Sequence, residues 1–490
     1  MRPINTVARA RLLEEIQRTT PARAGVVAAR LRVGVATLHR MMKEYGADIF
    51  GVGGSSNRRY AVRRPLRGQR APLPVYRINE VGQGDLAGTL EMVAPRGSFL
   101  DLRAMGWPTL KDTSGWWEGL PYPIYDMRPQ GFLGRNFARW VHGDLAVPES
   151  PTDWNDDDIA HVLSQRGADT IGNLIVGDRA FERFLDTVTQ PFVPIAADLT
   201  VEHYAQIAQE VANLGVPGSS AGGEFPKFTA CRELDSAATP HVIVKFSGAE
   251  DSATVVRWAD LLTCEHLALE TLREACGLSS VRSRILGGQG RTYLETERFD
   301  RHGFWGRSAV VSLDALNGAL IGAAETNWPG LGLRLLEHGL IDGTLRESID
   351  VLWWYGRLIG NTDMHLGNLS FRFQPVPGQS PRLALAPTYD MLPMFYAPLA
   401  GGEVPSRDFA PPLPLPLQRP AWGRAFHGAL AFWRRAASDA RISAPFRQIC
   451  TTNGDRLEAL GGREGVAKPG LANPHQPATP ILTPQFPTGE

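Results

Sequence analysis

The sequence is poor in cysteine. Its 490 residues include only four, and no two of them have the spacing of a metal-binding pair. This excludes the common zinc motifs and the disulfide frameworks that support small secreted domains. We expect four reduced, buried thiols, at Cys231, Cys264, Cys276 and Cys450.

Long hydrophobic runs are also lacking. No stretch of about 18 apolar residues could span a membrane, and Met1-Arg2-Pro3 leads into a charged segment where a signal peptide would have an apolar core. The composition, with 43% hydrophobic and 21% charged residues, is typical of a globular protein. The length predicts about three domains, and we expect a cytoplasmic protein.

The chain has no net charge, because 51 Lys and Arg balance 51 Asp and Glu. The charges are nevertheless unevenly distributed. Residues 1–70 hold 15 basic and 4 acidic residues, whereas the remainder holds 36 basic and 47 acidic residues. A basic head therefore precedes an acidic body, and basic regions of this size often bind nucleic acid.

The head contains three helical patterns. Thr6 is predicted to cap the first helix, and Thr20-Pro21 is predicted to open a second helix that runs to Leu31. A third helix is predicted over residues 35–45. The apolar positions expected to face the core are Val7, Ala10, Leu13 and Ile16 in the first helix, and Val35, Leu38 and Met42 in the third.

Residues 49–52 and 59–62 flank a turn of Gly, Ser and Asn, as the two strands of a wing would. We therefore predict a winged helix-turn-helix DNA-binding domain over residues 1–64. The alternative is a basic interaction module that does not contact DNA. Side chains expected to be exposed on the third helix and the wing are the candidate DNA contacts: Thr37, His39, Arg40, Lys43, Arg58 and Arg59.

The rest of the chain is predicted to be an α+β body. Residues 63–74 have the composition of a linker, and residues 75–145 alternate as a small β region would. Residues 150–300 and 301–460 follow as a strand-containing lobe and a helical lobe. The tail over residues 462–490 is rich in Pro, Gly, Thr and Gln, and we expect it to be disordered.

The segment over residues 360–371 carries the strongest chemical signal. Asp363 and Asn368 have the spacing of a kinase catalytic loop, in which the carboxylate accepts a proton from the substrate hydroxyl and the amide oxygen binds magnesium. A helix over residues 349–359 and a strand over residues 369–373 are predicted on either side. The spacing alone also fits two polar residues in an ordinary turn.

Two more residues fit the same chemistry. Asp390 follows an apolar strand and could be the second magnesium ligand. Lys245 lies among apolar residues in a predicted strand over residues 241–246, where its burial is costly unless it meets a phosphate or a carboxylate. The predicted helix over residues 260–275 offers both Glu265 and Asp260 as its partner, and the sequence does not choose between them.

A loop of small residues, 218–224, precedes this strand. Such residues let backbone amides approach a phosphate closely, although the loop has neither of the common phosphate-binding spacings. The composition equally fits a flexible turn.

Five segments together resemble those of the HipA-like kinases, the toxins of type II toxin–antitoxin systems. They are residues 219–224, 242–246, 297–301, 360–370 and 389–392, in the family's order and spacing. The basic head resembles the YjjJ-like variant of that family, in which a DNA-binding module is fused to the kinase. Phe225 and Gly367 depart from the pattern, because Gln and Lys are common at these positions.

The resemblance implies a two-lobed serine/threonine protein kinase that uses ATP and Mg²⁺. Asp363 would be the base, and Asn368 and Asp390 the metal ligands. Either Ser219 or Ser220 would be autophosphorylated, which would eject the loop and silence the enzyme. The residues that would bind the nucleotide are Lys245, Glu297, Phe299, Ser219, Ser220, Gly222, Gly223 and His365.

The expected partners are a protein substrate and double-stranded DNA, with a possible homodimer on a DNA operator. Two other functions fit parts of the pattern. A small-molecule kinase of the aminoglycoside or lipid type shares the Asp-to-Asn spacing, but the serine-rich loop and residues 297–301 argue against it. A transcription regulator that only senses nucleotide would not need a catalytic base such as Asp363.

Overall fold

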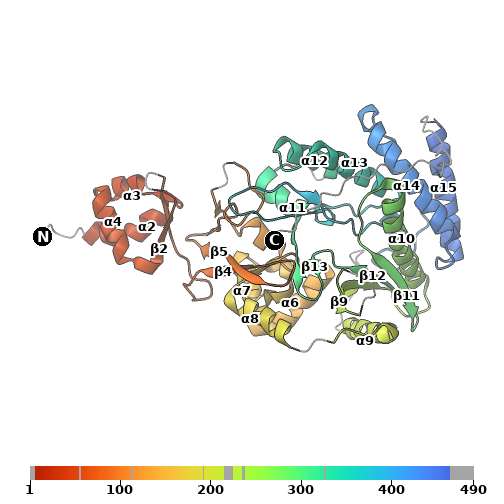
Figure 1. Ribbon diagram of the computed structural model, residues 1–490, viewed down its shortest axis with the longest axis horizontal. Helices are drawn as coiled ribbons and strands as arrows, with labels where there is room; N and C mark the ends of the chain where they lie inside the picture. Colours follow the sequence, from red (N-terminus) through yellow and green to blue (C-terminus); the bar gives the residue numbers. More distant parts are fainter. Residues whose placement is uncertain are drawn as a thin grey trace, which may run out of the picture.

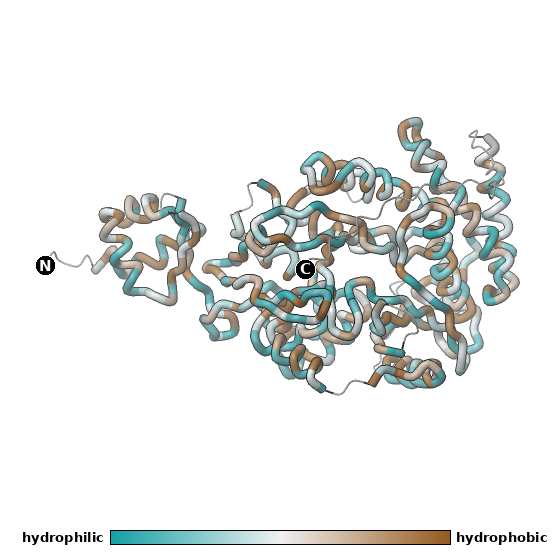
Figure 2. Tube along the Cα trace, in the orientation of Figure 1, coloured by the Kyte–Doolittle hydropathy of each residue, from teal (hydrophilic) through white to brown (hydrophobic). Residues whose placement is uncertain are grey.

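The computed structural model describes residues 6–54, 57–111, 114–190, 193–213, 225–233, 238–324 and 327–463. It confirms the mixed α+β class. A small N-terminal head stands at one end of a larger body (Figure 1). Along the helices, hydrophobic and hydrophilic residues alternate (Figure 2), as expected for helices with one face against a core. Within the described residues, no helix is both long and apolar enough to cross a membrane.

Within its described residues, the head contains four α-helices and a three-stranded sheet of order β1-β3-β2. Its third predicted helix and both predicted wing strands lie where the sequence places them. The core is formed by residues such as Leu12, Ile16, Val27 and Leu38. The elements are α1 (Thr6–Ala10), α2 (Leu12–Gln17), β1 (Ala22–Arg23), α3 (Ala24–Leu31), α4 (Val35–Glu44), β2 (Ile49–Val52) and β3 (Arg59–Val62).

Three predictions about the head were wrong. The second helix begins at Ala24 and not at Pro21, because residues 22 and 23 pair with β3 as an additional strand. In the first helix Ile16 is buried as predicted, but Val7 is 66% exposed and Ala10 is exposed, and the other buried apolar residues are Ala8 and Leu12. Val35 is 44% exposed because it occupies the first turn of α4.

The predicted linker is in fact attached to the body. Arg63 donates hydrogen bonds to both carboxylate oxygens of Glu91, at 2.7 and 2.9 Å. Arg64 and Arg67 pair with Asp157 and Asp158 in the first turn of α7 (Asp156–Arg166). Leu66, 7% exposed, belongs to the main core of the body. Residues 63–67 are therefore a docked segment, held by charges that composition alone does not locate.

The middle part of the chain is built on a five-stranded sheet of order β7-β6-β5-β4-β8. The division predicted between residues 145 and 150 does not match the hydrogen bonding, because β8 pairs with β4. The strands are β4 (Leu73–Ile78), β5 (Gly84–Met92), β6 (Ser98–Phe99), β7 (Trp116–Trp117) and β8 (Leu174–Val176). The helices are α5 (Tyr122–Asp126), α6 (Gly131–Leu145), α7 and α8 (Asp178–Thr189).

The next part is the strand-containing lobe. Its four-stranded antiparallel sheet has the order β11-β12-β10-β9, and α10 (Ala253–Cys276) lies against it with most of its side chains buried. Ser252 caps α10 by accepting a hydrogen bond from Val255. The other elements are α9 (Thr200–Asn213), β9 (Lys227–Cys231), β10 (His241–Phe246), β11 (Ser283–Gly288) and β12 (Arg291–Glu297).

The helical lobe completes the body. Its sheet has the order β15-β16-β17, and α14 packs against α10, α13 and α15. The apolar strand expected before Asp390 is β17, which is only two residues long. The elements are β15 (Ala309–Ser312), α11 (Leu313–Leu316), α12 (Trp328–Glu337), α13 (Gly343–Leu358), β16 (Ser370–Phe373), β17 (Ala384–Leu385), α14 (Arg419–Ser438) and α15 (Ala444–Arg463).

The tail predicted to be disordered lies outside the described residues from residue 464 onward. The four cysteines are free thiols, as expected, and three of them are buried. Cys231 is only half-buried because it ends β9, the edge strand of its sheet.

Candidate active site

Lys245 is the centre of the candidate site. It lies on β10, between Leu294 of β12 and Lys227 of β9, and is 5% exposed. Its ammonium group donates to both carboxylate oxygens of Glu265, each at 2.7 Å, and to the carboxylate of Asp390. The buried lysine is thus paired with two carboxylates, as the cost of burying its charge requires.

Glu265 is the helix carboxylate that the sequence could not identify. It is 1% exposed on α10 and faces Lys245. Asp260, on the same helix, accepts hydrogen bonds from the backbone and the hydroxyl of Ser443, both at 2.6 Å. Asp260 therefore secures the segment before α15, and only Glu265 contacts the lysine.

Lys245 and Asp390 stabilise each other's charged forms. Burial alone would lower the pKa of Lys245, but the carboxylates of Asp390 and Glu265 outweigh burial and raise it. Burial alone would raise the pKa of Asp390, but Lys245 and Lys227 outweigh it and lower that pKa to about 2. Lys245 is therefore an ammonium and Asp390 a carboxylate at neutral pH.

Lys227 is a residue that the sequence analysis missed. It lies opposite Lys245 on the neighbouring strand, and its charge acts on both Asp390 and Glu265. Its position directly after the loop of small residues was the available signal. It adds a second positive charge beside Lys245.

The loop after α13 brings the predicted base and metal ligands together. The side-chain amide of Asn368 donates to the backbone carbonyl of Asp363 at 2.8 Å. The backbone N–H of Asp363 donates to Oδ1 of Asn361 at 3.0 Å, and Nδ2 of Asn361 donates to the backbone carbonyl of Asp390 at 3.2 Å. Asn361, which the sequence analysis did not single out, therefore connects the two acidic residues.

The Asp363 side chain is exposed, whereas Asn368 is buried. His365 is exposed too; its ring nitrogen Nδ1 accepts from the backbone of Gly367 at 3.1 Å, and its carbonyl accepts from the Trp328 indole at 3.1 Å. The loop backbone is thus fixed from two sides, with the Asp363 carboxylate left accessible.

Asn368 and Asp390 have the chemistry of a magnesium site. Because Nδ2 of Asn368 is used within the loop, its amide oxygen Oδ1 is the end available to a cation. The Asp390 side chain is 29% exposed and already binds the ammonium of Lys245. Amide and carboxylate oxygens are hard ligands, and magnesium commonly takes one or two protein ligands beside substrate phosphates. These two residues fit that ion.

Asp390 has a left-handed backbone, with φ of 51°. Asp tolerates this conformation better than most residues, although at some cost. The preceding Tyr389 donates its hydroxyl to the backbone carbonyl of Gly367 at 2.7 Å. The turn that carries Asp390 is therefore tied directly to the loop that carries Asp363.

Glu297 and Phe299 lie at the end of β12. The backbone N–H of Glu297 donates to Arg282 and that of Arg298 donates to His241, both at 3.0 Å. A hydrogen bond from this backbone segment to a nucleotide would therefore have to use its other N–H and C=O groups. The Phe299 ring stacks on that of Tyr389, with centroids 5.6 Å apart. The predicted nucleotide-binding segment thus contacts Tyr389, the residue next to Asp390.

Four predicted loop residues lie outside the described part of the chain: Ser219, Ser220, Gly222 and Gly223. Phe225, the first described residue after this loop, is 5% exposed. Its ring packs edge-on against that of Trp258, with the ring centroids 4.6 Å apart. Nζ of Lys245 lies 5.8 Å from the centre of the Phe225 ring. Phe225 is therefore buried beside Lys245.

The candidate DNA contacts differ in exposure. On α4, His39, Arg40 and Lys43 are exposed, whereas Thr37 is half-buried and accepts a hydrogen bond from Arg40 at 3.2 Å. His39 also contacts the Tyr60 hydroxyl at 3.2 Å. The candidate interface is therefore centred on the exposed side chains of α4.

On the wing, Arg58 is exposed, whereas Arg59 is half-buried and reaches the carbonyl of Pro21 at 3.5 Å. Arg58 is thus the more accessible of the two wing arginines.

Comparison with known proteins places the chain among described families. Residues 69–185 match the family described as YjjJ-like toxin, middle domain, and residues 219–449 match the HipA-like C-terminal domain. Toxin YjjJ of Escherichia coli (strain K12) is 34% identical over 451 residues, which cover 92% of this chain and 97% of that protein.

Solved structures give more distant matches. HipA of Shewanella oneidensis MR-1, solved with HipB and its operator DNA, is 16% identical, with a TM-score of 0.49 over 80% of this chain and 97% of that one. The Helicobacter pylori proinflammatory kinase CtkA is 13% identical, with a TM-score of 0.32 over 47% of this chain and 87% of that one.

Proposed function

The chain belongs to the YjjJ-like toxins with a HipA-like C-terminal domain, and from this premise we propose that it is an ATP- and magnesium-dependent serine/threonine protein kinase. One observation carries the proposal. Lys245 joins Glu265 to Asp390, Asn361 joins the backbone of Asp390 to that of Asp363, and Asn368 bonds to Asp363. The residues proposed as phosphate lysine, metal ligands and base are thus connected to one another, which supports the proposal.

Each residue has a distinct role in this proposal. Lys245 binds the α- and β-phosphates of ATP while Glu265 keeps it in place. Asn368 and Asp390 hold magnesium, which neutralises phosphate charge when bound. Asp363 accepts the proton of the substrate hydroxyl. The hydroxyl oxygen then forms a bond to the γ-phosphorus of ATP, while the bond between the γ-phosphorus and the ADP oxygen breaks. Its exposed carboxylate is accessible to a protein side chain.

Adenine is proposed to bind at Glu297 and Phe299, with His365 and the loop of Gly222 and Gly223 around the phosphates. Autophosphorylation of Ser219 or Ser220 in that loop is proposed to silence the enzyme. The added phosphate brings nearly two negative charges close to the ATP phosphates, so repulsion drives the loop away.

The head is proposed to be a winged helix-turn-helix that reads an operator on double-stranded DNA. The exposed His39, Arg40 and Lys43 on α4 and Arg58 on the wing support this role. A fused head would bring the kinase to DNA in place of a separate antitoxin, and we propose that it binds there as a homodimer. The proposed location is the cytoplasm.

Incorporation of γ-phosphate from ATP tests the kinase proposal. The purified full chain is incubated with ATP and a serine/threonine protein mixture, with and without magnesium. Asp363→Asn keeps the size of the side chain but removes the base, and transfer should fall about 100-fold or more. Asp144→Asn, a surface change in the middle domain, is the control. Equal transfer by Asp363→Asn and the unaltered chain would contradict the proposal.

A further inference from the structure

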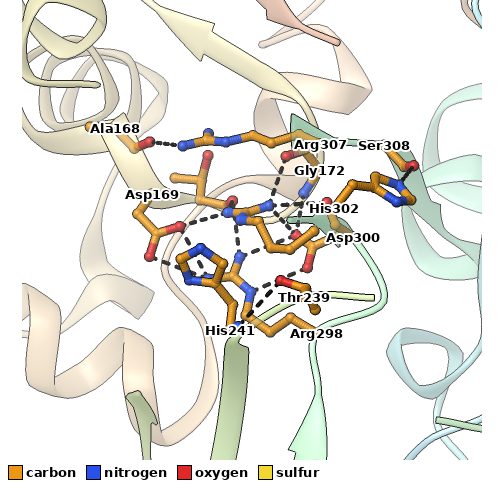
Figure 3. A network of polar contacts seen from close by, with 12 residues as sticks. Ala168, Asp169, Gly172, Thr239, His241, Arg298, Asp300, His302, Arg307 and Ser308 are labelled. Carbon is orange, nitrogen blue, oxygen red and sulfur yellow. Dashed lines mark hydrogen bonds and ion pairs between the residues drawn. The ribbon is translucent and has the colours of Figure 1, made fainter. Parts of the chain in front are cut away.

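The middle part of the chain contacts the predicted base-binding segment through a cluster of ion pairs (Figure 3). Asp169 ends the 3₁₀ turn (Gly167–Asp169) that follows α7. Its carboxylate binds Nη1 of Arg298 at 3.1 and 3.2 Å and Nη2 of Arg301 at 2.6 Å. Arg298 and Arg301 belong to the segment of Glu297 and Phe299, 129 or more residues away in the sequence.

Backbone groups extend the same contact. Arg301 donates to the carbonyls of Thr170 at 2.7 Å and Gly172 at 3.2 Å. In the reverse direction, the backbone N–H of Gly172 donates to the Asp300 carboxylate at 3.0 Å. Residues 169–172 and residues 298–301 are therefore interlocked by bonds in both directions.

Burial makes the carboxylates of this cluster important. Arg298 and Arg301 are 9% and 3% exposed, and buried guanidinium groups are costly unless carboxylates pair with them. Asp300 pairs with both from the inside, at 3.1 and 2.6 Å. Asp169 is the outer partner, with its side chain 61% exposed. Among the described residues that pair with these two arginines, removal of Asp169 would leave one carboxylate for two buried cations.

Arg298 connects this cluster to the nucleotide site. It lies between Glu297 and Phe299, so rotation of its backbone would move both. Phe299 stacks on Tyr389 at 5.6 Å with an interplanar angle of 21°, and Tyr389 precedes Asp390. The position of the Arg298 guanidinium therefore affects the adenine-binding segment directly, and it affects Asp390 indirectly through Phe299 and Tyr389.

We infer that Asp169 is a positioning residue of the nucleotide site, through which the middle domain holds the adenine-binding segment in place. The inference rests on the proposed kinase function, because it assigns a role in ATP binding. It makes the middle domain a part of the nucleotide site, although Asp169 touches neither ATP nor magnesium.

The inference predicts that loss of the Asp169 charge weakens the binding of ATP more than the binding of a triphosphate without adenine. Asp169→Asn removes one charge with little change in size. Because the adenine-binding segment is then held less firmly, the Kd for Mg-ATP should rise by about fivefold or more, the usual lower size of coupling between sites. Mg-tripolyphosphate has no adenine and does not contact this segment, so its Kd should change by less than about twofold, which corresponds to almost no coupling. In transfer assays KM for ATP should rise more than kcat falls.

Calorimetric titration of the full chain with Mg-ATP and with Mg-tripolyphosphate is the test. Asp169→Glu restores the charge and should recover most of the ATP affinity, whereas a purely structural defect would not be rescued selectively. Asp144→Asn is the matched control, since Asp144 is an exposed acid of the same domain paired with Arg166. Circular dichroism shows that each variant is folded.

Two results overturn the inference alone: an unchanged Kd for ATP in Asp169→Asn while the unaltered chain binds ATP, or equal weakening of ATP and tripolyphosphate. If Asp169→Asn does not fold, Arg298→Lys, which keeps a cation but loses the two-pronged pairing, replaces it with the same expected results. A chain that binds neither ligand, even unaltered, refutes the proposed kinase function itself.

Discussion

The ammonium group of Lys245 donates a hydrogen bond to the carboxylate of Asp390, 145 residues further along the chain. The same ammonium binds Glu265, so one cation serves two carboxylates from different lobes. Lys245→Met should therefore do two things. It should lower the free energy of unfolding by about 3 kcal/mol, because Glu265 is left buried without its cation, and it should abolish measurable ATP binding.

A second change separates these two effects. In Lys245→Met/Glu265→Gln the buried carboxylate is gone, so chemical denaturation should show most of the lost stability restored. ATP binding should stay absent, because no phosphate lysine is present. Recovery of ATP binding in the double variant would show that Lys245 does not bind phosphate.

Asp390→Asn tests the proposed metal site. It keeps the side-chain size and one oxygen but removes the negative charge that a divalent cation needs. Phosphoryl transfer should fall about 100-fold or more at a fixed magnesium concentration, and the magnesium concentration for half-maximal rate should rise. The measurement is a magnesium titration of γ-phosphate transfer. An unchanged titration curve would exclude Asp390 as a ligand.

Much of this site could be predicted from the sequence. The strand of Lys245 was placed at residues 241–246, its true bounds, because apolar residues mark a buried strand. Asp363 and Asn368 were identified from their spacing and Asp390 from the apolar strand before it, and hydrogen bonds connect the three in the structure. Spacing succeeds here because Asp363 and Asn368 lie on one short loop, where local geometry dictates which groups meet.

What the sequence could not predict depends on tertiary packing. Asp260 and Glu265 both lie on buried positions of α10, and only the packing of that helix decides which one meets Lys245. The pairing of Asp169 with Arg298 joins residues that no local pattern relates. In the head, Val7 and Ala8 are adjacent and both apolar, so the periodicity of the sequence could not decide which one faces the core.

Mass spectrometry after incubation with Mg-ATP tests self-silencing. The peptide over residues 215–227 should gain one phosphate while activity declines. Ser219→Ala and Ser220→Ala, made separately, identify the acceptor: the variant that lacks it should stay unmodified and remain active for longer, because no added charge repels ATP. An unmodified peptide in active enzyme after long incubation would argue strongly against this regulation.

Docking of residues 63–67 onto the body should depend on their arginines. Arg64→Ala/Arg67→Ala removes the pairs with Asp157 and Asp158, both in the first turn of α7. Thermolysin, which cleaves before apolar residues such as Leu66 and so does not depend on the altered arginines, should then cleave between head and body several times faster, because this segment opens more often. Arg77→Ala, which removes an exposed pair with Asp85, is the control. Equal cleavage rates in both variants would mean that the hydrophobic contacts of Leu66 suffice.

Substitutions in the head should separate base reading from phosphate binding. Arg40 lies exposed on α4, and an arginine that reads a base in the major groove contributes about 1–3 kcal/mol to discrimination. Arg40→Ala should therefore weaken binding to the preferred site by that amount and relax sequence choice. Arg58→Ala, on the exposed wing, should weaken all duplexes alike and reduce the salt dependence by about one phosphate contact.

The measurement is a titration of the full chain against genomic fragments, including its own upstream region, at several salt concentrations. Arg18→Ala is the control, because Arg18 is an exposed head arginine outside α4 and the wing that pairs with Glu14. A base contact is lost only on the preferred sequence, whereas a phosphate contact is lost on every sequence, so the two variants must differ in their ratio of specific to non-specific affinity. If the unaltered chain binds no duplex even at low salt, the head is a protein-interaction module and α4 has no groove to read.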